Sequence, residues 1–159
     1  MRTAIFPGSF DPFTLGHADI VSRGLRLFDK VVIAIGENRA KRGFLTTASR
    51  KRLIEDFYAD EPRVEVVVYG TLTGTLCREL GVSHIARGVR SVADFEYERG
   101  IADANRLLFP EIETVMFFSP AEVSAISSSV VREVASFGGD TTKLLPEGIR
   151  LDLYLTEDN

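Results

Sequence analysis

Short apolar runs alternate with longer amphipathic stretches along this chain. The short runs are rich in β-branched residues and predict five strands: Thr3–Phe6, Val31–Ile35, Val64–Tyr69, His84–Ala86 and Val115–Phe118. The longer stretches predict six helices: His17–Phe28, Ala48–Ala59, Gly74–Leu80, Phe95–Phe109, Ser128–Phe137 and Pro146–Leu155. Because strands and helices take turns, the pattern predicts an α/β protein with a parallel sheet, helices on its faces and right-handed crossovers.

Residues with special backbone preferences stand near the expected helix ends. Thr73, Asp94 and Asp140 occupy positions where a side chain would cap a helix N-terminus, and Gly81 stands where a helix would stop. Gly100 falls inside the fourth expected helix. A glycine there costs up to about 1 kcal/mol relative to alanine, unless close packing or a ligand needs it.

The length of 159 residues fits one domain, with a C-terminal helical segment from about residue 128. The composition, 45% hydrophobic and 26% charged, is that of a globular protein, and no internal repeat or low-complexity segment interrupts it. The net charge is −4. This argues against general binding to nucleic acid or an anionic membrane, since both require a basic surface.

The number of cysteines and the absence of long apolar runs indicate where in the cell the protein is located. The single cysteine, Cys77, cannot form an internal disulfide, which favours a reducing compartment. No charged-then-apolar leader opens the chain, and no apolar run approaches the roughly 20 residues that span a bilayer. We therefore expect a cytoplasmic protein.

Polar clusters follow the predicted strands. Ligands of parallel sheets bind beyond the carboxyl ends of the strands, so five loops are candidates: Pro7–Gly16, Gly36–Thr46, Gly70–Thr73, Arg87–Ala93 and Ser119–Ser127. Every cluster described below lies in one of these loops or at the start of the following helix. This coincidence favours a single ligand site more strongly than any one motif does.

The first loop has the pattern of a phosphate-binding corner. Gly8-Ser9-Phe10-Asp11-Pro12 could form a simple turn, but Thr14-Leu15-Gly16-His17 follows at once and opens a helix. Unpaired N–H groups and the positive dipole end of a helix attract phosphate, and His17 can donate to an oxygen that gains charge. The other histidine, His84, lies in a predicted strand, and we expect it to be a packed or surface residue.

Three further clusters carry charge or hydroxyl groups. Lys41-Arg42 follows the second strand and is either solvated surface or a cover over an anion. Arg87-Gly88-Val89-Arg90 can hold phosphate oxygens through forked hydrogen bonds, pair with Asp94, Glu96 or Glu98, or do both. The serines of Ile126-Ser127-Ser128-Ser129 cap a helix or form a second anion site.

Several other chemistries find no support. No Cys/His cluster has zinc-ligand spacing, and neither a P-loop nor a Gly-x-Gly-x-x-Gly fingerprint occurs. Ser9 and His17 lie in a phosphate-type loop without a nucleophile elbow. We expect any Mg²⁺ to be carried on nucleotide phosphates, with no metal ligand from the protein.

Taken together, these segments resemble the bacterial phosphopantetheine adenylyltransferase family. The matching residues are Pro7 to Pro12, Thr14 to His17, Lys41, Arg87 to Arg90, Asp94-Phe95-Glu96-Tyr97-Glu98 and Ile126 to Ser129, in the family's order and spacing over nearly the whole chain. The resemblance implies a single Rossmann-like nucleotidyltransferase domain. It also implies reversible transfer of AMP from ATP to 4′-phosphopantetheine, which gives dephospho-coenzyme A and pyrophosphate.

The resemblance assigns roles to individual residues. His17 would stabilise the transition state, with Lys41 and Arg90 as further catalytic residues. Phosphopantetheine would contact Ser9, Lys41, Thr73 and Arg87. ATP would contact Ser9, Phe10, His17, Gly88, Val89, Arg90, Glu98, Val123, Ser124, Ala125, Ile126, Ser127, Ser128 and Ser129. The family further implies Mg²⁺ as cofactor, a homohexamer and coenzyme A as a feedback ligand.

Some positions depart from the family pattern, and other functions stay open. Phe6 and Ser9 replace a frequent Tyr and Thr, and the stretch from Arg99 to Asp103 replaces a more apolar segment that lines the pantetheine arm and subunit contacts in relatives. The alternatives are another small-molecule nucleotidyltransferase, such as a nicotinamide-mononucleotide adenylyltransferase or a glycerol-phosphate cytidylyltransferase, or a nucleotide sensor without turnover.

Overall fold

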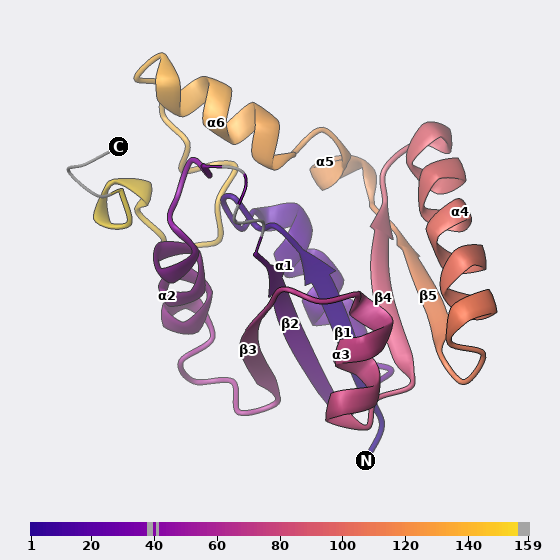
Figure 1. Ribbon diagram of the computed structural model, residues 1–159. Helices are drawn as coiled ribbons and strands as arrows, with labels where there is room; N and C mark the ends of the chain where they lie inside the picture. Colours follow the sequence, from indigo (N-terminus) through magenta and orange to yellow (C-terminus); the bar gives the residue numbers. More distant parts are fainter. Residues whose placement is uncertain (38–39, 41, 156–159) are drawn as a thin grey trace.

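The computed structural model of the chain describes residues 1–37, 40 and 42–155 (Figure 1). In this part of the chain, five parallel strands form one sheet in the order β3-β2-β1-β4-β5. The strands are β1 (Thr3–Gly8), β2 (Lys30–Gly36), β3 (Val64–Tyr69), β4 (His84–Val89) and β5 (Glu113–Phe118). All five predicted strands are therefore confirmed.

The helices connect the strands as the alternating pattern predicts. They are α1 (Leu15–Gly24), α2 (Thr47–Phe57), α3 (Thr73–Leu80), α4 (Val92–Leu108), the short α5 (Ala121–Ser124) and α6 (Ser128–Ser136). A 3₁₀ turn, Leu151–Leu153, follows near the end of the described chain. Among the described residues, no helix is both long and apolar enough to cross a membrane.

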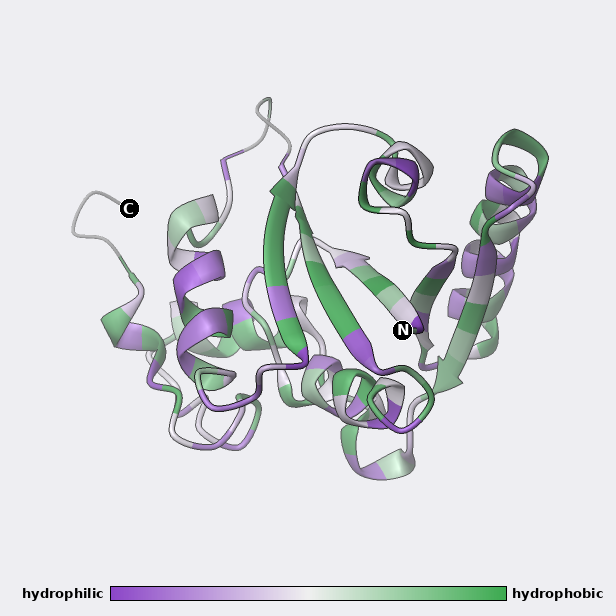
Figure 2. Ribbon diagram, turned by 90° about the horizontal axis from the view of Figure 1, so that it is seen from below, coloured by the Kyte–Doolittle hydropathy of each residue, from purple (hydrophilic) through white to green (hydrophobic). Residues whose placement is uncertain are grey.

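Two apolar layers, one on each face of the sheet, hold the helices in place. Alternate residues of a strand point to opposite faces, so Phe6 and Ile33 join one layer while Ile5 and Val32 join the other. The first layer receives side chains of α1, α2, α6 and the C-terminal segment, and the second receives those of α3 and the end of α4. Figure 2 shows the hydrophobic strands between helices of mixed character. The predicted Rossmann-like arrangement with helices on both faces is confirmed.

Two strands run two or three residues further at their carboxyl ends than their sequence pattern predicts. β1 continues through Gly8 and β4 through Val89, so Arg87 and Gly88 lie within β4 and not in the loop after it. Where the final residues of a strand face a cleft instead of the core, they are polar or small. The apolar pattern therefore stops before the strand does, and the predicted strand is too short.

Several predicted helix ends are wrong. Ser91 caps α4 by accepting a hydrogen bond from the Asp94 N–H, so the helix begins three residues before the predicted Phe95 and Asp94 lies in its first turn. α3 is capped by Leu72 without a side-chain hydrogen bond. No described helix begins at Asp140, whose carboxylate accepts from the N–H of Thr142. Gly81 ends α3 at φ 64°, as predicted.

The predicted helix Pro146–Leu155 is also wrong, since only the 3₁₀ turn Leu151–Leu153 forms there. Pro146 and Gly148, the latter at φ 82°, interrupt a regular helix. The apolar spacing of this segment still has a structural role, because Leu151 and Tyr154 pack into the first core layer.

Two glycines provide a stability test with opposite expected signs. The left-handed backbone at Gly81 disfavours any side chain, so Gly81→Ala should lower the free energy of unfolding by about 1 kcal/mol. A Cβ on Gly100 meets no atom within 4 Å, so Gly100→Ala should raise it by about 0.5–1 kcal/mol. Urea unfolding measures both. Shifts in the same direction for the two variants would contradict this interpretation.

Candidate active site

The candidate site lies where β1 and β4 part. These two neighbours pair only at Ala4–His84 and Ile5–Ile85, whereas β1 with β2 and β4 with β5 each pair at six positions. The strand order reverses at this point, which is where open parallel sheets bind ligands. A cleft of about 430 Å³ opens between the carboxyl ends of the two strands.

The cleft collects most of the predicted site residues from distant parts of the chain. Its walls include Ser9, Phe10, His17, Arg87, Gly88, Arg90, Glu98, Ile126, Ser127, Ser128 and Ser129. The first loop, the start of α1, the end of β4, α4 and the start of α6 therefore converge at one edge of the sheet.

A smaller chamber of about 180 Å³ adjoins the cleft. The two share Pro7, Gly8, Arg87 and Glu98 as lining residues. The far walls of the chamber come from Tyr69, Thr73 and the α4 residues Ile101, Ala102 and Asn105. Two ligands that fill the two spaces would therefore meet at Arg87.

His17 is fixed by a reciprocal cap at the start of α1. The buried Thr14 accepts the His17 backbone N–H through Oγ1 at 3.4 Å, and the Thr14 N–H donates to the imidazole Nδ1 at 3.0 Å. A ring nitrogen that accepts a main-chain N–H carries no proton. In the neutral ring the proton therefore sits on Nε2, which is left to donate into the cleft.

The surroundings of His17 keep its imidazole neutral. The rings of Phe6, Phe10 and Phe13 lie with centroids 5.0–6.1 Å from it. Burial, together with the positive charges of Arg90 and Arg87, lowers the pKa of His17 from 6.5 to about 3. His17 is thus a neutral hydrogen-bond donor at physiological pH.

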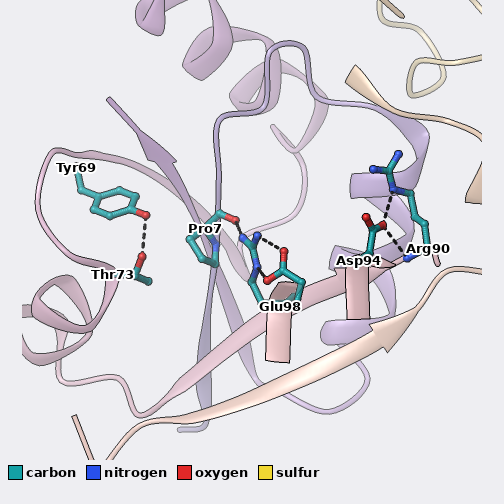
Figure 3. Close-up of polar contacts among 7 residues, drawn as sticks. Pro7, Tyr69, Thr73, Arg90, Asp94 and Glu98 are labelled. Carbon is teal, nitrogen blue, oxygen red and sulfur yellow. Dashed lines mark hydrogen bonds and ion pairs between the residues drawn. The ribbon is translucent and has the colours of Figure 1, made fainter. Parts of the chain in front are cut away.

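Arg87 bridges the gap between the parted strands. Its Nε and Nη2 donate to the two carboxylate oxygens of Glu98 at 2.7 and 2.6 Å, and its Nη1 donates to the carbonyl of Pro7 on β1 (Figure 3). Glu98 is 7% exposed, so this forked pair is largely shielded from water. A guanidinium has five N–H donors, and two of them stay available to a ligand.

Arg90 is held more loosely. Its backbone N–H and Nε both donate to the carboxylate of Asp94, at 3.2 and 3.3 Å (Figure 3). The Ser91 cap places Asp94 one turn along α4, in reach of Arg90. The predicted pairing of the two arginines with acids of α4 is confirmed, and the Arg90 side chain remains 41% exposed to an incoming anion.

The three serines begin α6 in different ways. Ser127 is the N-cap and accepts the Val130 N–H, Ser128 donates to the Pro12 carbonyl, and Ser129 accepts from Arg132. The Ser128 hydroxyl therefore ties α6 to the first loop, whereas those of Ser127 and Ser129 bond within α6. The main-chain N–H groups of Ser128 and Ser129 have no helical carbonyl to bond, and both residues line the cleft, so this helix start is an edge that an anion can use.

Two glycines of the cleft are required by close packing. A Cβ on Gly8 would meet the Phe10 ring at 2.9 Å, and one on Gly88 would meet Ile20 at 2.2 Å. Gly88 thus serves the approach of α1 to β4 as well as the open wall of the cleft. The tight contact at Gly8 places the Phe10 ring directly over the end of β1.

Some predicted site residues lie elsewhere. Thr73 lines the smaller chamber, where its Oγ1 lies 2.9 Å from the hydroxyl of Tyr69 (Figure 3). Val89, Val123, Ser124 and Ala125 do not line the cleft, and their contact with ATP stays a prediction. Lys41 lies outside the described residues. His84 packs against Phe28 at the opposite end of β4, as expected of a packed residue.

Sequence reasoning missed several residues that build the cleft. Arg132 lines it from α6 and donates to the Asp11 carbonyl at 2.8 Å. The Asp11 carboxylate accepts the N–H groups of Phe44 and Leu45 at 2.8 and 2.7 Å, which ties the second loop to the first. The spacing of Arg132 three residues after Ser129 on one helix face was a usable signal. The pairing of Asp11 with the second loop left no signal in the sequence.

The donor set of the cleft does not make a cage for a metal ion. Within the described residues, no group of three or more His, Cys, Asp or Glu side chains is placed to hold one. The carboxylates of Glu98 and Asp94 are each engaged by an arginine.

Comparisons with known proteins agree with this geometry. Residues 5–134 match a family model described as cytidylyltransferase-like. The phosphopantetheine adenylyltransferase of Flavobacterium psychrophilum is 50% identical over 151 residues, 95% of this chain and 99% of its own length. Those of Porphyromonas gingivalis and Lachnoclostridium phytofermentans are 50% and 42% identical, over 94% and 97% of this chain and 97% and 94% of their own lengths.

The protonation of His17 can be measured directly. Because the pKa lies near 3, ¹⁵N spectra of the imidazole should show a neutral ring protonated at Nε2 from pH 8 down to at least pH 5. Unfolding frees the ring to bind a proton below about pH 6.5, so the contribution of His17 to stability is complete above that pH and is lost progressively as pH falls toward 3. A ring that titrates near 6.5 would contradict the assignment.

Proposed function

The chain belongs to the phosphopantetheine adenylyltransferase family, and we propose that its cleft transfers AMP reversibly from ATP to 4′-phosphopantetheine, a step of coenzyme A biosynthesis. The protein is thus a nucleotidyltransferase. The observation that supports the proposal best is the placement of a neutral His17 donor and two arginines where two chambers meet at Arg87.

The proposed reaction is a direct in-line displacement. An oxygen of the phosphopantetheine phosphate forms a bond to the α-phosphorus of ATP. The bond from that phosphorus to the bridging oxygen breaks, and pyrophosphate leaves with the electron pair. The acceptor phosphate is already an anion, so neither a covalent enzyme intermediate nor a strong base is required. The protein has to hold two anions together in the right orientation.

The arginines offset the repulsion between the two anions. Arg87 faces both spaces, so its two available N–H groups can bind the acceptor phosphate from the wall that the chambers share. Arg90 lies exposed at the rim and can bind oxygens of the ATP triphosphate. We assign Lys41 to the same task, following the family, because it precedes the segment Phe44–Leu45 that Asp11 ties to the first loop.

His17 stabilises the charge that builds up at the centre. A neutral Nε2–H donor aimed at an α-phosphate oxygen strengthens its hydrogen bond as negative charge moves onto that oxygen. The low pKa prevents the imidazole from losing this preorganised state to protonation. Thr14 holds the ring so that no reorientation is required during the reaction.

The remaining site residues divide between the two substrates. We assign the nucleotide to the larger cleft, which Ser9, Phe10, Gly88, Glu98 and residues 126–129 line, and the pantetheine arm to the smaller chamber with Thr73. Contacts of the nucleotide with Val89 and residues 123–125 are assigned from the family alone. Within the segment that departs from the family pattern, Ile101 and Ala102 line the chamber, while Arg99 and Asp103 lie exposed and approach one another at 3.7 Å. The departure therefore leaves an apolar wall toward the ligand.

Cofactor, assembly and location are proposed from the family. Mg²⁺ bound by the phosphates would neutralise part of their charge, and the chain supplies no cage for it among the described residues. A homohexamer would cover part of the apolar surface of α4, where Val92, Tyr97, Leu107 and Leu108 lie exposed. Coenzyme A would act as a feedback ligand at the same two chambers. We propose that the protein is located in the cytoplasm.

Substrate specificity provides the decisive test of function. Pyrophosphate release is measured with ATP or CTP, each combined with 4′-phosphopantetheine, nicotinamide mononucleotide or glycerol phosphate. We expect release with ATP and phosphopantetheine alone. CTP is included because the matching family model is cytidylyltransferase-like. Release with another pair would indicate a different nucleotidyltransferase, and ATP binding without release in any combination would indicate a nucleotide sensor.

The role of His17 is tested by removing its donor. His17→Ala should lower kcat by about 10²–10³ and leave ATP affinity nearly unchanged, since the hydrogen bond strengthens only in the transition state. His84→Ala is the matched control, because the other histidine packs against Phe28 away from the cleft. Near-normal turnover by His17→Ala in a folded protein would remove His17 from the mechanism.

A further inference from the structure

One buried charge lies beside the site without lining it. Arg50 of α2 is 8% exposed, and its Nε has no hydrogen-bond partner in the part of the chain that the structure describes. Its Nη1 donates to the carbonyl of Ser9 at 2.7 Å, and its Nη2 donates to Thr47 at 3.1 Å. Within the described residues it forms no ion pair.

The fold alone does not account for a cation at this position. A guanidinium removed from water without an ion-pair partner is unfavourable, and replacing a buried charge by an apolar side chain of similar size is often neutral or stabilising. Arg50 also lies four residues after the Thr46 cap, near the positive end of the α2 dipole, where a cation is disfavoured. The two unfavourable placements point to a role outside α2.

The partner of Arg50 indicates that role. The peptide bond between Ser9 and Phe10 is trans, so its carbonyl and its N–H point in opposite directions. Arg50 holds the carbonyl from behind, and the Phe10 N–H consequently points away from Arg50, on the side where Ser9 and Phe10 line the cleft. This N–H donates no hydrogen bond within the described part of the chain.

The backbone at Phe10 needs such support. Phe10 has φ 49°, a left-handed conformation that non-glycine residues rarely adopt and that persists only when its surroundings enforce it. The Phe10 ring is 2% exposed and packs over Gly8, which fixes the side chain. Arg50 fixes the preceding carbonyl, so ring and peptide together hold the N–H in one direction.

We propose that Arg50 is a positioning residue for the adenylyl transfer, which locks the Ser9–Phe10 peptide so that the Phe10 N–H donates to a phosphate oxygen of the nucleotide. The proposal rests on the proposed function. Attraction of the Ser9 carbonyl toward the guanidinium also polarises this peptide, which makes its N–H a stronger donor. Arg50 itself touches neither substrate.

Two substitutions separate this role from simple packing. Arg50→Met keeps the length and apolar volume but loses both the charge and the donor, and it should lower kcat/KM for ATP by about 10- to 100-fold. Arg50→Lys keeps a charged donor and should recover most of that loss. Lys51→Met, on the neighbouring half-buried position that pairs with Glu55 at 3.3 Å, is the control and should match the parent chain.

Thermal unfolding of each variant and an amide spectrum complete the test. In the parent chain, the ¹⁵N–¹H resonance of Phe10 should move downfield when ATP is added, and this response should weaken in Arg50→Met and be largely kept in Arg50→Lys. Folded Arg50→Met with kcat/KM within twofold of the parent would overturn the proposal. A Phe10 resonance that does not shift when ATP is added would also overturn it. This measurement is made on the parent chain, so it does not depend on the folding of a variant. A parent chain without transferase activity would instead refute the proposed function.

Discussion

The early parting of β1 from β4 is the constraint on which the site depends. Two neighbouring strands that pair at only two positions leave their carboxyl ends unsatisfied and open to ligands. Arg87 bridges that opening, because it donates hydrogen bonds both to the Glu98 carboxylate on α4 and to the Pro7 carbonyl on β1. Both core layers include residues of β1 and β4, so the strands that border the opening are packed from both faces of the sheet.

Around this opening, the chain uses neutral and charged donors for different tasks. The charged donors, Arg87 and Arg90, are held by acids of α4 at the walls. The neutral donor, His17, is held by main-chain and hydroxyl groups of Thr14 inside an aromatic enclosure. The division follows from burial: a cation is tolerated where water or a carboxylate reaches it, whereas an enclosed imidazole is more stable without its proton.

The parts of this arrangement that sequence could predict are those with local signals. Alternating apolar patterns gave the strands, and the spacing around His17 gave the phosphate corner. The cap of α4 was assigned to Asp94 because the true cap, Ser91, lies only three residues earlier and has an equally suitable side chain. The cap of α3 was assigned to Thr73 because Leu72, which stands at that position, makes no capping hydrogen bond and leaves no local signal. Arg50 could not be found, because its partner Ser9 lies 41 residues earlier and only the folded chain brings α2 to the first loop.

Arg87 stands in the wall between the two chambers and already has three acceptors within the protein. A molecule that draws this guanidinium to one side changes its bonds on the other. Thermodynamic linkage then requires the effect to be mutual: the factor by which the first occupant changes the affinity of the second equals the factor in the reverse order. Cooperativity between nucleotide and acceptor would thus reside in a single side chain, without any movement of the sheet.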